Sequence, residues 1–131
     1  ICEVANGNRE KLVVNGDDYN TKDGTTIRDF IHVCDLAKMH IECAKYLMDG
    51  KETNIFNCGY GKGFSIKDVI NEMHKILNKE IKIEYGPRRD GDAVYSVADN
   101  KKFLKHFNWK PKYDNLKTIL ETSLNWEKNK N

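Results

Sequence analysis

The sequence predicts a mixed α/β (α+β) domain with short strands and about four helices. Short apolar or alternating runs, which are typical of strands, are interleaved with longer runs whose apolar residues recur every three or four positions, as in helices. A length of 131 residues fits one domain, so residues 1–131 are treated as one unit. Hydrophobic residues make up 39% and charged residues 32% of the chain, which supports a buried core beneath a charged surface.

The first elements are a helix end and a strand. Residues 1–7 read ICEVANG, which resembles the end of a helix closed by Gly7. Residues 11–16, KLVVNG, contain a β-branched run that ends on glycine, so they predict a brief strand. Residues 17–29 are polar and contain the Asp-Gly turn signal, and they predict a loop.

A helix and a second strand follow. Residues 35–50 predict a helix, with Asp35 placed to cap its N-terminus and Gly50 to end it. Its apolar face carries residues at three- and four-residue intervals: Leu36, Met39, Cys43 and Leu47. Residues 53–58, TNIFNC, are short and apolar and predict a strand.

The next helix and strands follow the same alternation. Ser65 begins a helix with a capping box in which Asp68 replaces the usual Glu or Gln, and an apolar stripe follows it. Residues 81–85, IKIEY, alternate with period two and predict a half-exposed strand. A loop, GPRRDGD, separates it from residues 93–97, AVYSV, a candidate short strand.

Two helices end the chain. Asp99 is placed to cap a helix that carries Phe103, Leu104 and Phe107, and the NWKPKYDN segment breaks it. The last helix begins near Leu116, and its apolar residues predict an inward face of Ile119, Leu120 and Trp126.

Composition excludes several classes of function. The net charge of +2, with Lys and Glu interspersed, does not predict nucleic-acid binding. No apolar run approaches the ~20 residues of a membrane span, and the first residues lack the basic start and long apolar stretch of a signal peptide. The cysteines (Cys2, Cys34, Cys43 and Cys58) and the four histidines have no metal-ligand spacing, so we expect reduced thiols in a cytoplasmic protein and no metal.

The glycine run NCGYGKGFS, residues 57–65, lies between a predicted strand and a predicted helix. A dinucleotide-binding turn has the pattern GxGxxG, but the third glycine of that pattern is Phe64 here, and few parallel strands follow. The glycines therefore favour a tight strand-to-helix turn, or a turn that brings bare backbone against a different ligand.

Four blocks carry a resemblance to UDP-glucose 4-epimerases, members of the extended short-chain dehydrogenase/reductase family. DGTTIRDFIHVCDLAKMHI resembles their DGTxxRDYIHVxDLAxxH run, and GPRRDGDAVYSVAD resembles their PRRxGD segment. NIFNCGYGKGFSIKDVI and FNWKPKYDNL resemble two further segments, in the same order and with nearly the same spacing. The resemblance covers only the C-terminal part of such an enzyme. It implies a substrate-binding domain whose N-terminal partner, a Rossmann fold that binds NAD and supplies the catalytic residues, is absent from this sequence.

The resemblance implies a UDP-sugar site in this chain. Arg28 and Arg89 match the residues that bind the diphosphate, which suits guanidinium groups because they pair with phosphate in a bidentate manner and stay charged. Asp92 matches the acid that accepts hydrogen bonds from the ribose. An alternative is that both arginines form ion pairs with their neighbours Asp29 and Asp90, and that Asp92 is simply a turn residue.

Further positions match residues around the nucleotide. Val13 and Asn15 match the uracil pocket, although Asn15 replaces an aromatic residue, and Ile66 matches an apolar nucleotide contact. Phe30 stands where the family has tyrosine, so only the ring of that contact remains. His32 is interpreted as a structural residue rather than an acid or base, because it lies in a strand-like segment before a helix.

Ser96 bears on sugar specificity. It matches a position where family members restricted to glucose and galactose carry tyrosine, and where a small residue accompanies acceptance of N-acetylhexosamines. A small side chain leaves volume for an acetamido group. The resemblance therefore predicts that UDP-N-acetylglucosamine and UDP-N-acetylgalactosamine are substrates as well.

The implied function is that of an NAD-dependent UDP-glucose/UDP-galactose 4-epimerase, a homodimer as a whole enzyme, with no catalytic or NAD-binding residue in this chain. The chain alone is then expected to be inactive. Two alternatives remain open: a nucleotide-sugar dehydratase or decarboxylase of the same family, and a free-standing binding module for nucleotide-sugars.

Overall fold

The computed structural model describes residues 1–130, which form five helices and five short strands. The helices are α1 (Cys2–Ala5), α2 (Val33–Met48), α3 (Ile66–Leu77), α4 (Lys101–His106) and α5 (Leu116–Asn129). The strands are β1 (Leu12–Asn15), β2 (Ile27–Asp29), β3 (Gly63–Ser65), β4 (Ile83–Gly86) and β5 (Tyr95–Ser96). The mixed α/β class is therefore confirmed, with five helices rather than about four because α1 is a separate single turn.

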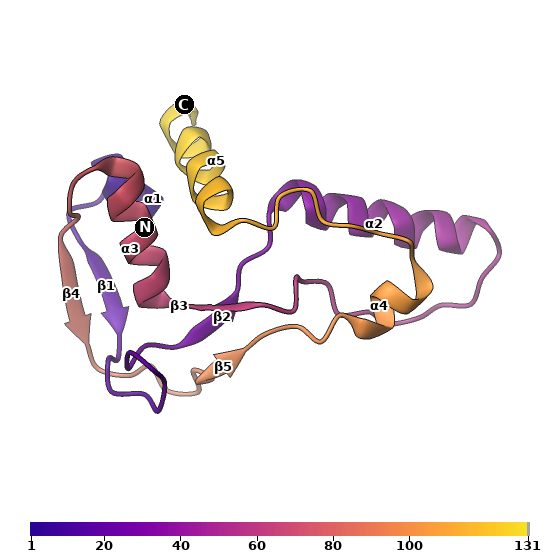
Figure 1. Cartoon of the computed structure of the whole chain (residues 1–131), viewed down its shortest axis with the longest axis horizontal. Helices are drawn as coiled ribbons and strands as arrows, with labels where there is room; N and C mark the ends of the chain where they lie inside the picture. Colours follow the sequence, from indigo (N-terminus) through magenta and orange to yellow (C-terminus); the bar gives the residue numbers. More distant parts are fainter. Residues whose placement is uncertain (131) are drawn as a thin grey trace.

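The molecule is elongated (Figure 1). At one end, α1, α3, α5, β1 and β4 gather into what we call the lobe, and at the other end α2 and α4 form what we call the arm. The strands β2, β3 and β5 lie between the two ends, so the short sheet that they form joins the lobe to the arm.

Two small sheets organise the strands. In the lobe, β1 pairs with β4 in parallel, from Leu12 opposite Ile83 to Asn15 opposite Gly86. In the joining sheet, β2 is central, antiparallel to β3 and parallel to β5. Both sheets therefore bring together segments that are far apart in the sequence.

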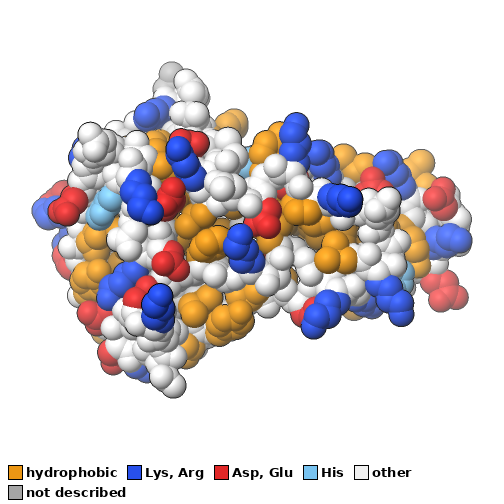
Figure 2. Space-filling view, viewed as in Figure 1, with side chains coloured by type: hydrophobic (Ala, Val, Ile, Leu, Met, Phe, Trp, Pro, Cys, Tyr) orange, Lys and Arg blue, Asp and Glu red, His pale blue; other side chains and the backbone are white. Residues whose placement is uncertain are grey.

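Each end has its own hydrophobic core. The lobe core is formed by buried residues of α1, α3 and α5: Ala5, Val69, Met73, Leu120 and Leu124. The arm core is centred on Met39, Phe103 and Phe107, with Phe56 and Trp109 packed against it. Hydrophobic side chains also reach the surface along the molecule, interspersed with charged ones (Figure 2).

The start of α3 confirms the predicted capping box. Ser65 Oγ accepts from the backbone N–H of Asp68 at 3.0 Å, and the Asp68 carboxylate accepts from the N–H of Ser65 at 3.0 Å. Ser65 also donates to Asp23 at 2.5 Å, which ties the preceding loop to the helix. Asn78 ends the helix in the left-handed region, with a φ of 51°.

The strand predicted at residues 53–58 is wrong. In the part of the chain that the structure describes, these residues form no strand, and Ile55 is 82% exposed. A strand requires a neighbour that takes up its hydrogen bonds, whatever its propensity. Here Phe56 packs instead against Phe103 and Phe107, at ring-centroid distances of 6.0 and 5.2 Å.

Several smaller expectations are also corrected. His32, rather than Asp35, caps α2, because its ring nitrogen Nδ1 accepts from the N–H of Cys34 at 3.1 Å. Asn100 occupies the capping position of α4 that was expected for Asp99. Trp126 is 72% exposed and Leu104 is also exposed, so neither joins the core. Leu124 takes the inward position on α5, since it lies one turn after Leu120.

Candidate functional site

A cavity of about 310 Å³ lies where β1, β2, the start of α3 and the loop after β4 meet. We call it the arginine cavity. Ten residues line it: Leu12, Val13, Val14, Asn15, Gly16, Thr26, Arg28, Ile66, Arg89 and Asp92. Six of the eight site residues expected from the sequence are among them, although the first and last of these six are 79 positions apart.

Strand pairing explains this convergence. Because β1 and β4 run in parallel and in register, the chain leaves both strands at the same edge of the sheet. Asn15 at the end of β1 therefore lies beside the loop of residues 87–92 that follows β4. Arg28 enters from β2, whose neighbour β3 leads directly into Ile66 at the start of α3.

The cavity carries an excess of positive charge. Arg28 pairs with Asp92, with 2.5 Å between Nη2 and Oδ1, and it donates through Nη1 to the carbonyl oxygen of Ile27 at 2.7 Å. The two paired side chains are only 25% and 28% exposed. Arg89 lines the same cavity and makes no ion pair or side-chain hydrogen bond with any residue in the range 1–130. Two guanidinium groups and one carboxylate leave a net charge of +1.

The local ion pairs considered from the sequence do not form among the described residues. Arg28 reaches Asp92, 64 positions away, rather than its neighbour Asp29, and Arg89 is not paired with Asp90. Asp92 is also part of a turn, because its N–H donates to the carbonyl oxygen of Arg89 at 3.2 Å. Asp92 is therefore both a turn residue and a residue that lines the arginine cavity.

A second cavity, of about 500 Å³, lies on the other side of Arg28. Residues 56–58 and 96–99 form its two walls, and Arg28 and Asp29 lie between them. Ser96 is in this cavity, which we call the serine cavity, and is exposed. Of the residues that the structure describes, Arg28 is the one that lines both the arginine cavity and the serine cavity.

Phe30 lies apart from the other expected site residues. Its half-buried side chain packs against the lobe core and lines neither the arginine cavity nor the serine cavity. A nucleotide-contacting role for Phe30 therefore stays a prediction without a cavity to support it.

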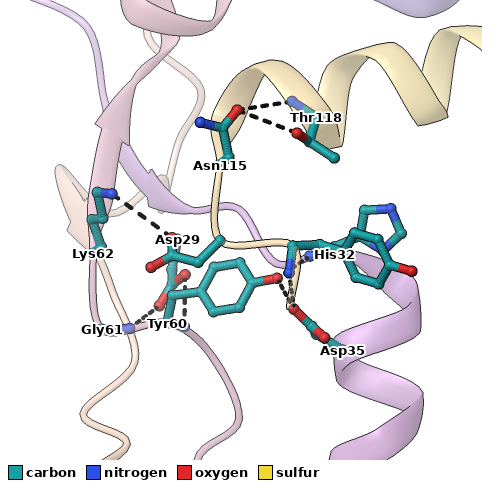
Figure 3. Close-up of polar contacts among 10 residues, drawn as sticks. Asp29, His32, Asp35, Tyr60, Gly61, Lys62, Asn115 and Thr118 are labelled. Atoms are coloured by element: carbon teal, nitrogen blue, oxygen red, sulfur yellow. Dashed lines mark hydrogen bonds and ion pairs between the residues drawn. The ribbon is translucent and has the colours of Figure 1, made fainter. Parts of the chain in front are cut away.

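Asp29 holds the glycine run in place, a role that the sequence did not reveal. Its carboxylate accepts from the backbone N–H groups of Tyr60 (3.2 Å), Gly61 (3.0 Å) and Ala98 (3.3 Å). Figure 3 shows the first two of these contacts. One side chain therefore joins β2, the glycine turn and the segment after β5, the last of which lines the serine cavity.

The glycine turn does not fit NAD. A pyrophosphate requires free N–H groups at such a turn, whereas those of Tyr60 and Gly61 already donate to Asp29. The turn is also packed closely, because a Cβ at Gly63 would lie 2.5 Å from the Ile27 side chain and 2.8 Å from that of Val97. The two N–H groups are therefore not available to a pyrophosphate, and the close packing explains why residue 63 is glycine.

Replacing Gly59 by alanine is expected to lower the free energy of unfolding by about 2 kcal/mol. The new Cβ would lie 2.5 Å from Oδ2 of Asp29 and 2.7 Å from Cβ of Ala98, so the turn must move. Denaturant unfolding of the variant measures the loss. Gly86→Ala is the matched control, because a Cβ there meets Val13 at an ordinary 3.5 Å. Equal stability of the two variants would show that the turn tolerates the shift.

Another carboxylate, that of Asp35, anchors the arm. Asp35 is 0% exposed, and its oxygens accept from the N–H groups of Lys112 (2.9 Å) and Tyr113 (2.8 Å) and from the hydroxyl of Tyr60 (2.7 Å). Burial raises the pKa of Asp35, but the hydrogen bonds from these donors together lower it by more than burial raises it. The pKa of Asp35 therefore lies below its ordinary value. The pKa of Tyr60 is raised by burial and by its hydrogen bond to Asp35.

His32 completes this network (Figure 3). Its backbone N–H donates to the hydroxyl oxygen of Tyr60 at 3.3 Å, and its Nε2 is hydrogen-bonded to Thr122 Oγ1 at 3.0 Å. Its ring is stacked on that of Tyr113, with centroids 4.3 Å apart. His32 thus has the structural role expected from the sequence. The cluster joins α2, the glycine turn and α5.

Residues 1–130 contain neither a cluster of metal ligands nor a helix that could span a membrane. No three His, Cys, Asp or Glu side chains in that range come close enough to hold a metal ion together. None of the helices there has the length and apolar character needed to cross a membrane.

Known proteins resemble the chain over nearly its whole length. A family model described as GDP-mannose 4,6 dehydratase matches residues 1–122. The UDP-glucose 4-epimerase of Lacticaseibacillus casei is 44% identical over 129 residues, which are 98% of this chain and 39% of that protein. The chain therefore spans about two-fifths of that relative's length.

Solved structures show the same fold. The UDP-Glc/GlcNAc 4-epimerase of Campylobacter jejuni is 47% identical, with a TM-score of 0.86 over 97% of this chain and 38% of that one. The UDP-glucose 4-epimerase of Bifidobacterium longum, in complex with NAD⁺ and UDP, is 36% identical, with a TM-score of 0.86 over 98% of this chain and 38% of that one. Both structures contain more than twice the length of chain described here.

Proposed function

The chain belongs to the family described as GDP-mannose 4,6 dehydratase, and on that premise we propose that it is the nucleotide-sugar-binding part of an NAD-dependent UDP-hexose 4-epimerase. The high similarity to epimerases supports this proposal over other members of the family. The observation that carries it is the convergence of Arg28, Arg89 and Asp92 on one cavity.

The arginine cavity suits the diphosphate of UDP. Arg28 has five N–H donors and uses two groups, Nη1 and Nη2, on Ile27 and Asp92, so further donors are available to phosphate oxygens. Arg89 has no competing partner among residues 1–130. The net positive charge of the cavity favours an anionic ligand, and two forks bind a diphosphate with defined geometry.

The other lining residues suit the nucleoside. In our proposal Asp92 accepts from the ribose hydroxyls, Val13 and Asn15 line the uracil, and Ile66 packs against the nucleotide. Holding UDP at these points positions the sugar without contacting its reacting carbon, so the binding energy acts remotely from the chemistry.

The cofactor is proposed to bind outside this chain. The glycine turn does not fit NAD, whereas the Bifidobacterium longum structure, which contains NAD⁺, has a chain of which this one covers 38%. When bound, NAD supplies the hydride acceptor for the sugar carbon. The residues described here would bind and orient the UDP-sugar.

Activity measurements on the natural protein that carries this chain test the proposal. With NAD and UDP-glucose, we expect UDP-galactose to form, as followed by NMR. The 131-residue chain alone is expected to bind UDP in calorimetry and to leave UDP-glucose unchanged. Formation of a 4-keto-6-deoxy sugar would show the dehydratase alternative, the activity that the family description names. UDP binding without turnover by the natural protein would show a binding module.

Replacing Ser96 by tyrosine is expected to restrict the enzyme to plain hexoses. In our proposal Ser96 leaves room for an acetamido group beside the sugar, and the 47% identical UDP-Glc/GlcNAc 4-epimerase supports this breadth. We expect kcat/KM for UDP-N-acetylglucosamine to fall at least about 10-fold, and that for UDP-glucose to change by less than about 3-fold. Ser96→Ala, which keeps the space, should retain both activities. Equal losses on both sugars in Ser96→Tyr would contradict this specificity role.

A cytoplasmic location and a homodimeric whole enzyme are also proposed. The first is supported by the unpaired cysteines of residues 1–130, and the second by the family resemblance. Fractionation of cells and sedimentation of the natural protein, respectively, test them.

A further inference from the structure

Arg88 and Arg89 are adjacent, but their surroundings differ. Arg89 lines the arginine cavity without a partner among residues 1–130, whereas Arg88 points to the loop that follows β1. Arg88 donates through Nε to the carboxylate of Asp18 at 2.7 Å and through Nη2 to the backbone carbonyl oxygen of Asp18 at 2.5 Å. Its guanidinium also lies over the ring of Tyr19, 4.5 Å from the centroid.

The backbone around this contact is closely packed. Gly16 has a φ of +85°, and a Cβ there would lie 2.6 Å from the Tyr19 ring and 2.8 Å from the Arg88 side chain. The N–H of Gly16 donates to the carbonyl oxygen of Gly86 at 2.9 Å. Tyr19 itself is buried. The end of β4 and the loop that follows it are therefore fastened to the loop after β1 at two points, Gly86 and Arg88.

We propose that Arg88 is a positioning residue, which fastens residues 86–92 to the loop after β1 so that Arg89 faces the diphosphate, while Asp92 is held by Arg28. The proposal rests on the proposed UDP-binding function. The Arg89 side chain makes no ion pair or hydrogen bond within residues 1–130, so its position depends on the backbone that Arg88 holds. The guanidinium of Arg88 makes two hydrogen bonds and is stacked on the buried ring of Tyr19. These contacts restrain both the direction and the distance of the Arg88 side chain, so they fix the backbone of residue 88 better than a single contact would.

A double-mutant cycle on the natural protein that carries this chain tests the coupling. UDP and uridine affinities are measured by calorimetry for the wild type, Arg88→Ala, Arg89→Ala and the double variant. We expect Arg88→Ala to weaken UDP binding roughly 10-fold and the double variant to bind UDP within about 2-fold of Arg89→Ala alone. Uridine, which lacks the phosphates, should bind Arg88→Ala within about 2-fold of the wild type.

Two further variants separate geometry from charge. Arg88→Lys keeps the charge but loses the fork, so we expect it to bind UDP almost as weakly as Arg88→Ala. Asp18→Asn removes the carboxylate partner and is expected to weaken UDP binding in the same direction. Arg9→Ala is the matched control, because Arg9 is an exposed arginine paired with Glu3 at 3.9 Å. Its UDP affinity should be unchanged.

Several outcomes would overturn the positioning role. These are additive losses in the cycle, full rescue by Arg88→Lys, an unchanged UDP affinity in Arg88→Ala, or an equal loss of uridine affinity. A wild-type protein that does not bind UDP would instead refute the proposed function. If thermal melts show that Arg88→Ala does not fold, the UDP and uridine affinities of Asp18→Asn are compared with those of the wild type by the same criteria. Asp18→Asn leaves the stacked Arg88 and Tyr19 in place.

Discussion

Arg28→Ala is expected to lower the affinity for UDP on the order of 100-fold, and to lower kcat/KM for UDP-glucose with it. Among residues 1–130, the variant removes the only side chain that lines both the arginine cavity and the serine cavity. It also leaves the carboxylate of Asp92 without its 2.5 Å partner, so an unpaired, half-buried negative charge then lies in the cavity that takes the diphosphate. Lost attraction and new repulsion therefore act in the same direction.

A second variant separates these two contributions. Adding Asp92→Asn to Arg28→Ala removes the unpaired charge, so we expect UDP affinity to recover in part, while ribose recognition is lost. Lys82→Ala is the control, since Lys82 is an exposed cation paired with Glu10 and lies outside the cavity. Calorimetric titration with UDP measures all three. Unchanged UDP affinity in Arg28→Ala would remove Arg28 from the site.

Asp35→Ala is expected to lower the free energy of unfolding by about 3 kcal/mol or more. The variant leaves two backbone N–H groups, of Lys112 and Tyr113, and the hydroxyl of Tyr60 without an acceptor in a buried place. It also releases the segment that precedes α5 from the start of α2. Urea unfolding measures the loss, and Asp90→Ala, at an exposed position, is the control.

Acid should reproduce part of this effect. Because the pKa of Asp35 in the folded chain lies below its ordinary value of 3.8, the carboxylate contributes its full stabilisation above that value. The contribution is lost as the pH falls through the folded pKa. Stability measured between pH 7 and pH 3 should therefore fall less steeply in Asp35→Asn, which cannot titrate, than in the wild type. Parallel curves would show that Asp35 does not carry the acid sensitivity.

The helices could be predicted because their determinants are local. The capping box of Ser65 and Asp68 and the stripe that follows lie within four turns of chain, and the structure confirms both. The strands β2 and β3 could not be predicted, because each is short and lies in a polar or glycine-rich segment. Their hydrogen bonds come from partners tens of residues away, such as Arg28 opposite Phe64.

The site shows the same division. A motif resemblance located Arg28, Arg89 and Asp92, but the residue types alone left open whether the arginines pair with adjacent acids. The structure excludes those local pairs within residues 1–130 and joins Arg28 to Asp92. The roles of Asp29 and Asp35 had no sequence signal, because both are acidic residues in segments that predict a loop and a cap.

By itself, the sequence determined the family resemblance, the mixed α/β class, the three longer helices and the residue types available for a diphosphate. Only the tertiary structure decided which acid neutralises Arg28, which arginine stays free, and why the glycine turn does not fit NAD. The physical reason is the sequence separation over which each interaction acts. Helix periodicity and capping act over a few residues, whereas an ion pair, a parallel strand register and a close backbone approach depend on segments that only folding brings together.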